Sequence, residues 1–161
     1  TAATQATTMH LEPIDDDRID AMMTWFPDAA ACLVWGGVDF RFPYTDETFR
    51  TDARIADLPS YALVDDAGAF VGFGQYYRRL GRCHVARLAV APDARGRGCG
   101  SVLIEQLCKL GHRTLGVAGD SLFVLEQNVD AKRLYLRLGF RDATYPEALP
   151  PAHVYMVRDP A

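Results

Sequence analysis

The first 60 residues contain one clear helical pattern and one stretch with no clear period. Four large apolar residues within 15–26 recur at helical spacing, which predicts a helix that ends before Pro27. A short strand is expected over 8–12. The segment 32–44 is aromatic, glycine-punctuated and weakly periodic, so we interpret it as a loop. Thr45, followed by two acidic residues, is typical of a helix start.

From residue 61 onward, short strand patterns alternate with helical ones. An acidic, glycine-containing turn at 65–68 predicts a β-hairpin between the strands that flank it. The expected strands cover 61–64, 70–77, 83–90, 122–125, 140–145 and 153–157. One expected helix ends at Gly111, and another covers 128–138. This order predicts a mixed α/β or α+β sheet with helices on its faces.

Chain length and charge narrow the class of protein. With 161 residues, 49% of them apolar, the chain fits a single domain over 1–161 with a core from about 8 to 157. Its formal net charge of −4 provides no broad positive field for binding nucleic acid. An anionic ligand must therefore be held locally, by a few basic side chains or by backbone N–H groups. A mildly acidic surface also tolerates cationic acceptors.

The cysteines and the N-terminal residues indicate a reduced, cytoplasmic setting. Cys32, Cys83, Cys99 and Cys108 lack the paired spacing of a zinc site and the density of a disulfide scaffold, so we expect free thiols and no metal. Residues 1–8 are small and polar, without the apolar stretch of a signal peptide, and no apolar run approaches the length of a membrane span. We therefore expect a cytoplasmic protein with no membrane partner.

The clearest chemical signal is a glycine-rich turn between the strand expected over 83–90 and the helix that follows it. Gly96, Gly98 and Gly100 provide an open backbone, and Arg95 and Arg97 add positive charge. At a helix N-terminus, unpaired N–H groups and the helix dipole favour an anion. The turn is therefore a candidate phosphate-binding site.

Two common phosphate-binding motifs fit this turn poorly. A P-loop needs a lysine after its last glycine, whereas Ser101 follows Gly100 directly. A dinucleotide fingerprint needs glycine or alanine three residues after its second glycine, and the two ways of counting reach Ser101 and Leu103. A tight turn with surface arginines is the plain structural alternative.

Two motifs together carry a resemblance to a known family. Leu-Ala-Val-Ala-Pro at 88–92 and Arg-Gly-Arg-Gly-Cys-Gly at 95–100 resemble the acetyl-CoA signature of the GCN5-related N-acetyltransferases (GNAT). The family's second signature is matched by Asn128, Ala131, Tyr135, Gly139 and Phe140. The order of elements is similar to that of the family from about 8 to 157. The resemblance implies the GNAT fold, with a central mixed, mostly antiparallel twisted sheet and helices on both faces.

The resemblance also implies acetyl-CoA as the co-substrate, together with the residues that bind it. The backbone of Leu88, Ala89 and Val90 would pair with the pantetheine arm like an added strand, and one of their N–H groups would polarise the thioester carbonyl. Asn128 would hydrogen-bond the pantetheine. The pyrophosphate would be bound by Arg95, Gly96, Arg97, Gly98, Cys99, Gly100 and Ser101.

Candidates for the general acid and base come from one helix and two strand positions. Residues 128 and 135 lie about 20° apart around a helix axis, so both are expected to face one cleft. The resemblance makes Tyr135 the general acid toward the CoA sulfur. Two candidate bases stay open: His84, which shares a face with Leu88 if the strand is regular, and Glu126. A packed core tyrosine and a strand histidine bonded to a neighbour are the plain alternatives.

The acceptor is expected to enter past the segments 32–44 and 146–155. Trp35, Phe40 and Tyr44 are the candidates for contacting a cationic amine, and covering the core is their alternative role. We therefore expect an acetyl-CoA-dependent N-acetyltransferase that moves an acetyl group directly to a primary amine of a small molecule or peptide. A monomer or homodimer is expected. The alternative is a non-catalytic acyl-CoA binding or sensing module of the same fold.

Overall fold

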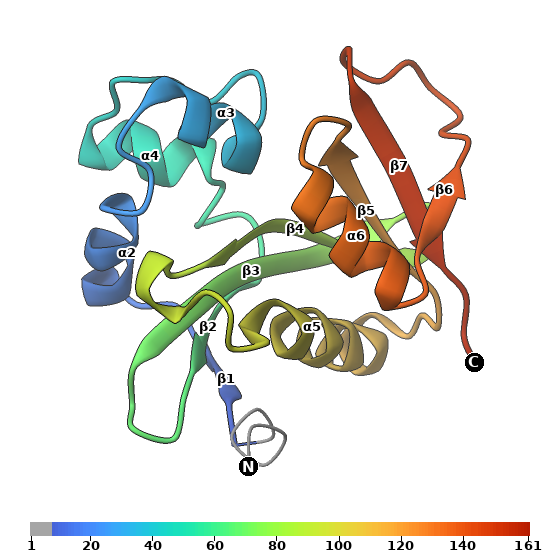
Figure 1. The fold of residues 1–161 in the computed structure, drawn as a ribbon, viewed down its shortest axis with the longest axis horizontal. Coiled ribbons are helices and arrows are strands. Elements are labelled where there is room, and N and C mark those ends of the chain that lie inside the picture. The colour runs from blue at the N-terminus through green and yellow to red at the C-terminus, as the bar shows by residue number, and fades with distance from the viewer. Residues whose placement is uncertain (1–7) are drawn as a thin grey trace.

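The computed structural model describes residues 8–161, which form one seven-stranded sheet with helices on both faces (Figure 1). Residues 1–7, which hold most of the small polar start and the first part of the expected domain, lie outside the described residues. The strands are β1 (His10–Pro13), β2 (Ser60–Val64), β3 (Phe70–Arg79), β4 (Arg82–Val90), β5 (Asp120–Leu125), β6 (Arg141–Ala143) and β7 (His153–Arg158).

The order of strands across the sheet is β1-β2-β3-β4-β5-β7-β6. Every neighbouring pair is antiparallel except β4 and β5, which are parallel. The expected mixed, mostly antiparallel sheet is therefore confirmed. The parallel pair lies near the middle of the sheet, so its two strands are flanked on both sides.

The helices are α2 (Asp16–Met23), α3 (Ala29–Gly36), α4 (Asp46–Asp52), η1 (Pro92–Ala94, a 3-10 helix), α5 (Cys99–Leu115) and α6 (Val129–Arg137). Helices α5 and α6 cover one face of the sheet, and α2, α3 and α4 cover the other (Figure 1). Each face has its own apolar core, centred on Leu103 and Leu107 under α5 and on Phe49 and Phe73 under the early helices. No helix within 8–161 has both the length and the apolar character needed to cross a bilayer.

Side-chain caps explain why the early helices begin where they do. The carboxylates of Asp15 and Asp28 accept hydrogen bonds from backbone N–H groups in the first turns of α2 and α3. Thr45 and Thr48 form a reciprocal capping box, which confirms the helix start expected at Thr45. The helix expected over 15–26 and the other expected elements are present, with ends that differ by a few residues.

The expectation of a loop over 32–44 is wrong for its first part, which belongs to α3. Asp28 caps this helix, and Cys32 and Trp35, three residues apart, are buried in the core. The sequence of α3 is apolar on nearly every side. It therefore lacks the one-sided pattern by which an amphipathic helix is recognised.

The expected helix end at Gly111 is also wrong. Helix α5 continues to Leu115 and ends at Gly116, whose φ of 67° is typical of a glycine that terminates a helix. Gly111 lies instead where α5 packs against β4, and a Cβ atom there would collide with the Sγ atom of Cys83. This glycine permits a close helix–sheet contact within the core.

A buried polar cluster joins β4, α5, β5 and β7. The carboxylate of Asp120, 4% exposed, lies 2.6 Å from Nε2 of His112 and accepts a hydrogen bond from Nε of Arg158 at 3.0 Å. The sulfur atoms of Cys83 and Cys108 and a carboxylate oxygen of Asp120 lie within 4.8 Å of one another. The neighbouring Cys83 thiol and burial raise the pKa of Cys108, so this thiol stays protonated. All four cysteines of the chain are free.

Candidate functional site

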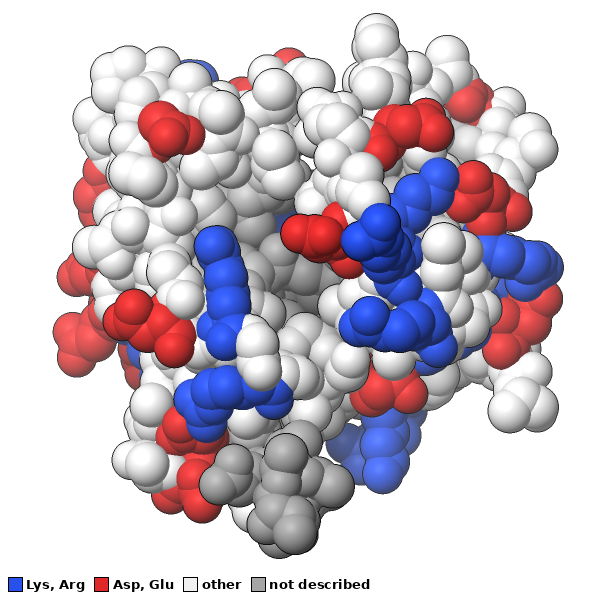
Figure 2. Space-filling model, in the orientation of Figure 1, with Lys and Arg blue, Asp and Glu red and all other residues white. Residues whose placement is uncertain are grey.

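A cavity of about 990 Å³ opens where β4 and β5 separate, between α3 on one side and α6 on the other. Figure 2 shows the molecule hollowed at this place, with Lys and Arg side chains on either side of the opening. The walls come from α3, β4, the turn after β4, the end of β5, and α6. The cavity therefore collects residues from segments that lie far apart in the sequence.

Strands β4 and β5 are paired over only a short distance. Their parallel ladder stops at the pair formed by His84 and Ser121. Leu88, Ala89 and Val90 lie beyond this point and line the cavity. Because β3 occupies the other edge of β4, the backbone groups that face β5 here have no strand partner within 8–161. Such an edge fits an extended ligand that pairs like a strand.

The turn between β4 and α5 has the open backbone expected from its sequence. Gly96 and Gly98 have φ angles of 80° and 76°, and Gly98 is the N-cap of α5, without a side-chain cap. The first N–H groups of α5 are therefore left for an anion, with Arg95 on the wall beside them. A Cβ atom at Gly100 would lie 3.0 Å from Cδ2 of Leu134 on α6. The turn thus fits a diphosphate group.

The polar side chains of this turn have different surroundings. Arg97 lies outside the cavity wall, and its guanidinium pairs with the buried carboxylate of Asp65 at 3.3 Å, which ties the turn to the β2–β3 hairpin. The expectation that Arg97 helps to bind the pyrophosphate stays a prediction, although its side chain does not line the cavity. Cys99 and Ser101 do line the cavity. The thiol of Cys99 donates to the carbonyl oxygen of Ala94 at 3.6 Å, and burial raises its pKa.

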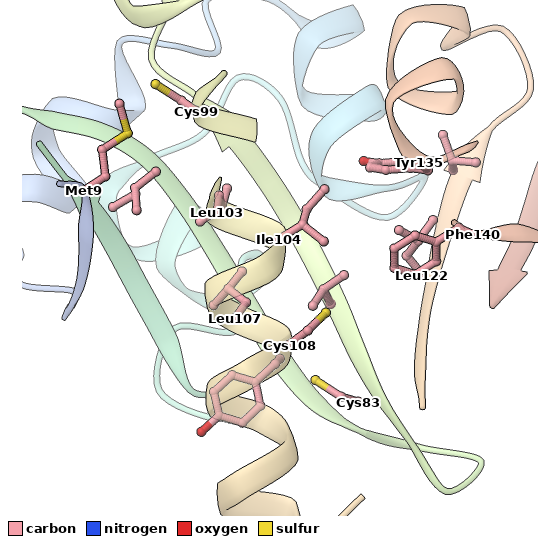
Figure 3. Packing of buried hydrophobic residues seen from close by; sticks show 14 of the residues in the cluster. Met9, Cys83, Cys99, Leu103, Ile104, Leu107, Cys108, Leu122, Tyr135 and Phe140 are labelled. Carbon is pink, nitrogen blue, oxygen red and sulfur yellow. The ribbon is translucent and has the colours of Figure 1, made fainter. Parts of the chain in front are cut away.

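Tyr135 and Asn128 both line the cavity, so the structure brings together the two side chains that helical spacing placed on one face. Tyr135 is 8% exposed, and its ring packs edge-on against Phe140 in the core that also contains Leu122 (Figure 3). Burial raises the pKa of Tyr135 to about 12, so its hydroxyl is protonated at neutral pH. Within 8–161 this hydroxyl has no hydrogen-bond partner, which leaves it free to donate to a ligand.

His84 lies at the end of the parallel ladder and also lines the cavity. Its Nδ1 is hydrogen-bonded to Oγ of Ser121 at 2.8 Å, and the residue is 1% exposed. Burial, followed by the positive charges of Arg79 and Arg87, lowers the pKa of His84 to about 3. The imidazole is therefore neutral at physiological pH.

A β-bulge places His84 on a different face from the one expected. Strand β4 has one residue more than β3 between two of their paired positions, and Arg87 in this bulge has a φ of 49°. Val85, Leu88 and Val90 all pack into the core under α5, so His84, next to Val85, lies on the opposite face of the sheet, where its ring contacts Tyr77 and Phe123. The expectation that His84 and Leu88 share a face, which assumed a regular strand, is wrong.

Glu126, the other candidate base, lies outside the cavity. Its side chain is 69% exposed and lies 3.9 Å from Nζ of Lys132. Its backbone N–H donates to the carbonyl oxygen of Ala152 at 2.7 Å, which directs this part of the chain toward the segment before β7. Of the two candidate bases, only His84 meets the cavity wall.

The three aromatic residues expected to contact the acceptor are placed differently. Trp35 lines the cavity. The ring of Phe40 packs against Trp35 with centroids 5.5 Å apart, and the hydroxyl of Tyr44 donates to the carbonyl oxygens of Met23 at 2.6 Å and Phe26 at 3.0 Å. Phe40 and Tyr44 therefore belong to the core beneath α3 and α4, which corrects the expectation that they contact the acceptor.

A sequence model of the acetyltransferase (GNAT) family matches residues 21–140, which is most of the chain. The chain belongs to this family. Solved structures with the same fold include spermidine N-acetyltransferase from Vibrio cholerae in complex with CoA and spermine, with a TM-score of 0.71, 16% identity, and coverage of 94% of this chain and 95% of that one. A GNAT-family acetyltransferase from Bacillus anthracis has a TM-score of 0.73, 13% identity and the same coverage. The expected GNAT fold is confirmed.

A curated relative is mycothiol acetyltransferase from Mycobacterium leprae (strain Br4923), which is 33% identical over 111 residues. The match covers 56% of this chain and 36% of that protein. The GNAT domain described above thus matches about a third of the length of this relative.

Sequence reasoning missed several residues that line the GNAT cavity. Tyr77, Phe123 and His153 lie on its wall, and the rings of Tyr77 and Phe123 have centroids 5.1 and 4.6 Å from that of His84. Arg87 lies on the wall as well. The one available signal for Arg87 was a charged residue within the otherwise apolar second half of β4.

Proposed function

We propose that this GNAT domain is an acetyl-CoA-dependent N-acetyltransferase that moves an acetyl group directly to a primary amine. The observation that carries the proposal is the meeting of three features in one cavity: the unpaired edge of β4, the uncapped N-terminus of α5 and the hydroxyl of Tyr135. Family membership supports it, as do relatives with CoA bound from Vibrio cholerae and Thermoplasma acidophilum.

The acyl-CoA would lie along β4 and across the start of α5. Leu88, Ala89 and Val90 would pair with the pantetheine through their backbone, and the diphosphate would meet the first N–H groups of α5 beside Arg95. Asn128 would hydrogen-bond the pantetheine from α6. When bound, acetyl-CoA supplies a thioester carbonyl that is activated toward amines. An N–H group on the free edge of β4 would donate to the carbonyl oxygen, where negative charge develops.

Two side chains are proposed to handle the protons. The bond from the amine nitrogen to the acetyl carbon forms as the carbon–sulfur bond breaks, so the sulfur gains a proton and the nitrogen loses one. Tyr135, whose pKa is raised to about 12, stays protonated and would donate to the departing sulfur. His84 would accept a hydrogen bond from the amine, and the proton that the nitrogen loses would pass to solvent, from which the Tyr135 oxygen would regain one. Because the pKa of His84 is lowered to about 3, the acceptor must already be a neutral amine when it attacks.

Release of free thiol from acetyl-CoA over a panel of amines tests this proposal. Tyr135→Phe is expected to lower kcat by about 100-fold or more, because it removes the acid but keeps the ring. Its Kd for CoA, measured by calorimetry, is expected to change little. Tyr76→Phe is the matched control: Tyr76 is equally buried, but its hydroxyl pairs with Thr114 at 2.8 Å, outside the cavity.

An unchanged rate in Tyr135→Phe would contradict the role of Tyr135. CoA binding in the calorimeter without thiol release on any amine class would instead identify the domain as a non-catalytic acyl-CoA binding module. These two outcomes are distinct, because the first requires turnover and the second excludes it.

A further inference from the structure

Arg87 lies on the cavity wall with most of its hydrogen-bonding capacity unused. A guanidinium has five N–H donors, and within 8–161 this one forms a single hydrogen bond, from Nη1 to Oε1 of Gln75 at 3.1 Å. Its Nε atom is buried without a partner in that part of the chain. Burial lowers the pKa of Arg87, as expected for a cation removed from water without a counter-charge. Such a group binds an anion strongly.

Neighbouring hydrogen bonds hold Arg87 in position. Its carbonyl oxygen accepts a hydrogen bond from Nε1 of Trp35 at 2.8 Å. The amide nitrogen of Gln75 donates to the carbonyl oxygen of Ala53 at 2.7 Å and to Oγ of Ser60 at 3.0 Å, which turns the amide oxygen toward Arg87. Gln75 is fully buried. The guanidinium is therefore held in place before any ligand arrives.

The charges around Arg87 are positive. Arg54 is close enough to lower the pKa of Arg87 further, and Arg79 and Arg87 together act on His84. Among the described residues on the cavity wall, Asp130 is the one acidic residue, and it lies in the first turn of α6. No ion pair within 8–161 includes Arg87. This part of the cavity favours an anion and opposes a polycation.

We propose that the acceptor carries a carboxylate close to its amine, as a free amino acid does, and that Arg87 binds this carboxylate. The inference rests on the proposed acetyl transfer, because it names the acceptor class for the same site. It narrows the expected primary amine of a small molecule or peptide to one that carries a carboxylate nearby. The amine would lie toward His84, on the face of the sheet opposite α5.

Matched sets of acceptors test the carboxylate directly. Each set consists of an amino acid, its carboxamide and the corresponding decarboxylated amine, so that the amine is kept while the anion is removed. Thiol release is expected to show a kcat/KM at least about tenfold higher for the amino acid than for the other two. Phosphoethanolamine and spermidine complete the panel, as a phosphate-bearing amine and a polycation.

The variant Arg87→Gln tests whether Arg87 causes the preference for amino acids. Glutamine keeps a donor for the amide oxygen of Gln75 but has no charge. The variant is expected to lose about 30-fold or more in kcat/KM on amino acids, and to stay within about threefold of the wild type on carboxamides. Arg87→Lys, which keeps the charge, is expected to recover part of the loss. Arg113→Gln on the exposed end of α5 is the control, with no expected change.

A binding measurement keeps the test independent of turnover. Trp25 and Trp35, the two tryptophans of the chain, both line the cavity, so their fluorescence in the CoA complex reports an occupied acceptor site. Saturable quenching by amino acids that weakens at least about tenfold in Arg87→Gln supports the proposal.

The failures of the two proposals are distinguishable. Turnover of amines with equal kcat/KM for amino acids and carboxamides overturns the carboxylate site but leaves acetyl transfer standing. A preference for phosphoethanolamine or spermidine overturns it as well. Absence of both thiol release and saturable quenching overturns both proposals, whereas quenching without turnover supports the carboxylate site and contradicts catalysis.

Discussion

The indole N–H of Trp35 donates to the carbonyl oxygen of Arg87 at 2.8 Å, across 52 residues of sequence. This hydrogen bond joins α3 to the bulge in β4, where Arg87 has a positive φ. A non-glycine residue in this conformation is strained by about 1 kcal/mol or more, so it needs such support. The contact thereby links the packing of the early helices to the geometry of the cavity wall.

We expect Trp35→Phe to destabilise the protein by about 1–3 kcal/mol, because it removes the hydrogen bond and part of a buried ring. The KM for the acceptor is expected to rise, whereas the KM for acetyl-CoA stays close to that of the wild type. Urea unfolding and steady-state kinetics measure these effects. Tyr44→Phe is the control, because it removes hydrogen bonds to the carbonyl oxygens of Met23 and Phe26 in the same core but lies outside the cavity. Equal changes in both KM values would contradict this link.

Substitutions of the two glycines at the ends of α5 distinguish an effect on ligand binding from an effect on stability. Gly98 and Gly116 have φ angles of 76° and 67°, and a Cβ atom at either position would meet nothing within 4 Å. Gly98→Ala and Gly116→Ala should therefore each destabilise the protein by about 1 kcal/mol. Only Gly98→Ala is expected to raise the Kd for CoA, because only Gly98 lies in the cavity. Calorimetry would refute the diphosphate site if both variants bound CoA alike.

The buried carboxylate of Asp120 is expected to matter far more for stability than an exposed one. Asp120→Asn removes the buried counter-charge of Arg158, which keeps only its more exposed partner Glu105 at 2.6 Å, so we expect a loss of about 2–3 kcal/mol in the free energy of unfolding. Asp159→Asn, whose carboxylate is 50% exposed and pairs with Arg82 and Arg141, should cost less than about 1 kcal/mol. Urea unfolding at pH 7 measures the loss in both variants. Similar losses would show that the buried polar cluster around Asp120 contributes no more to stability than an exposed ion pair.

The low pKa of His84 predicts how stability depends on pH. In the unfolded chain this histidine binds a proton below about pH 6.5, whereas in the folded protein its pKa is lowered to about 3. The unfolded state therefore binds more protons between these values, so stability falls as the pH decreases from 6.5. Between pH 6.5 and 5 the loss due to His84 is about 2 kcal/mol.

Urea unfolding from pH 5 to 7.5 measures this dependence. His84→Gln keeps a hydrogen-bonding partner for Ser121 and should remove that part of the decline. Identical pH profiles for the two proteins would show that His84 titrates normally in the folded state. Catalysis should rise with pH according to the ionisation of the acceptor amine, without an inflection near pH 6.5 from His84.

The geometry of the proposed cofactor half of the site could be predicted, because it depends on residues close together in the chain. Gly96 and Gly98 occupy positions where the chain adopts a positive φ, and Gly98 also begins α5. Asn128 and Tyr135 share a face because both lie on one helical stretch. A regular turn and a regular helix translate sequence spacing directly into geometry.

The acceptor half could not be predicted, because it depends on irregular structure and on contacts between distant segments. One extra residue in β4 reverses the alternation of faces, so His84 lies opposite the side that strand spacing indicates. Trp35, Phe40 and Tyr44 are all aromatic residues of the segment 32–44, and nothing in the sequence distinguishes their roles. Only the packing of α3 and α4 decides that Trp35 reaches the cavity while Phe40 and Tyr44 support the core.

The sequence by itself determined the family, the order of elements and the place of the glycine-rich turn before α5, since each depends on residues close together in the chain. The tertiary structure decided the charge on the wall around Arg87, where we propose that the acceptor binds. A net charge of −4 averages over the whole chain. A ligand instead responds to the few charges within about 10 Å, and at this wall the bulge and the early helices leave Arg87 without an acid beside it.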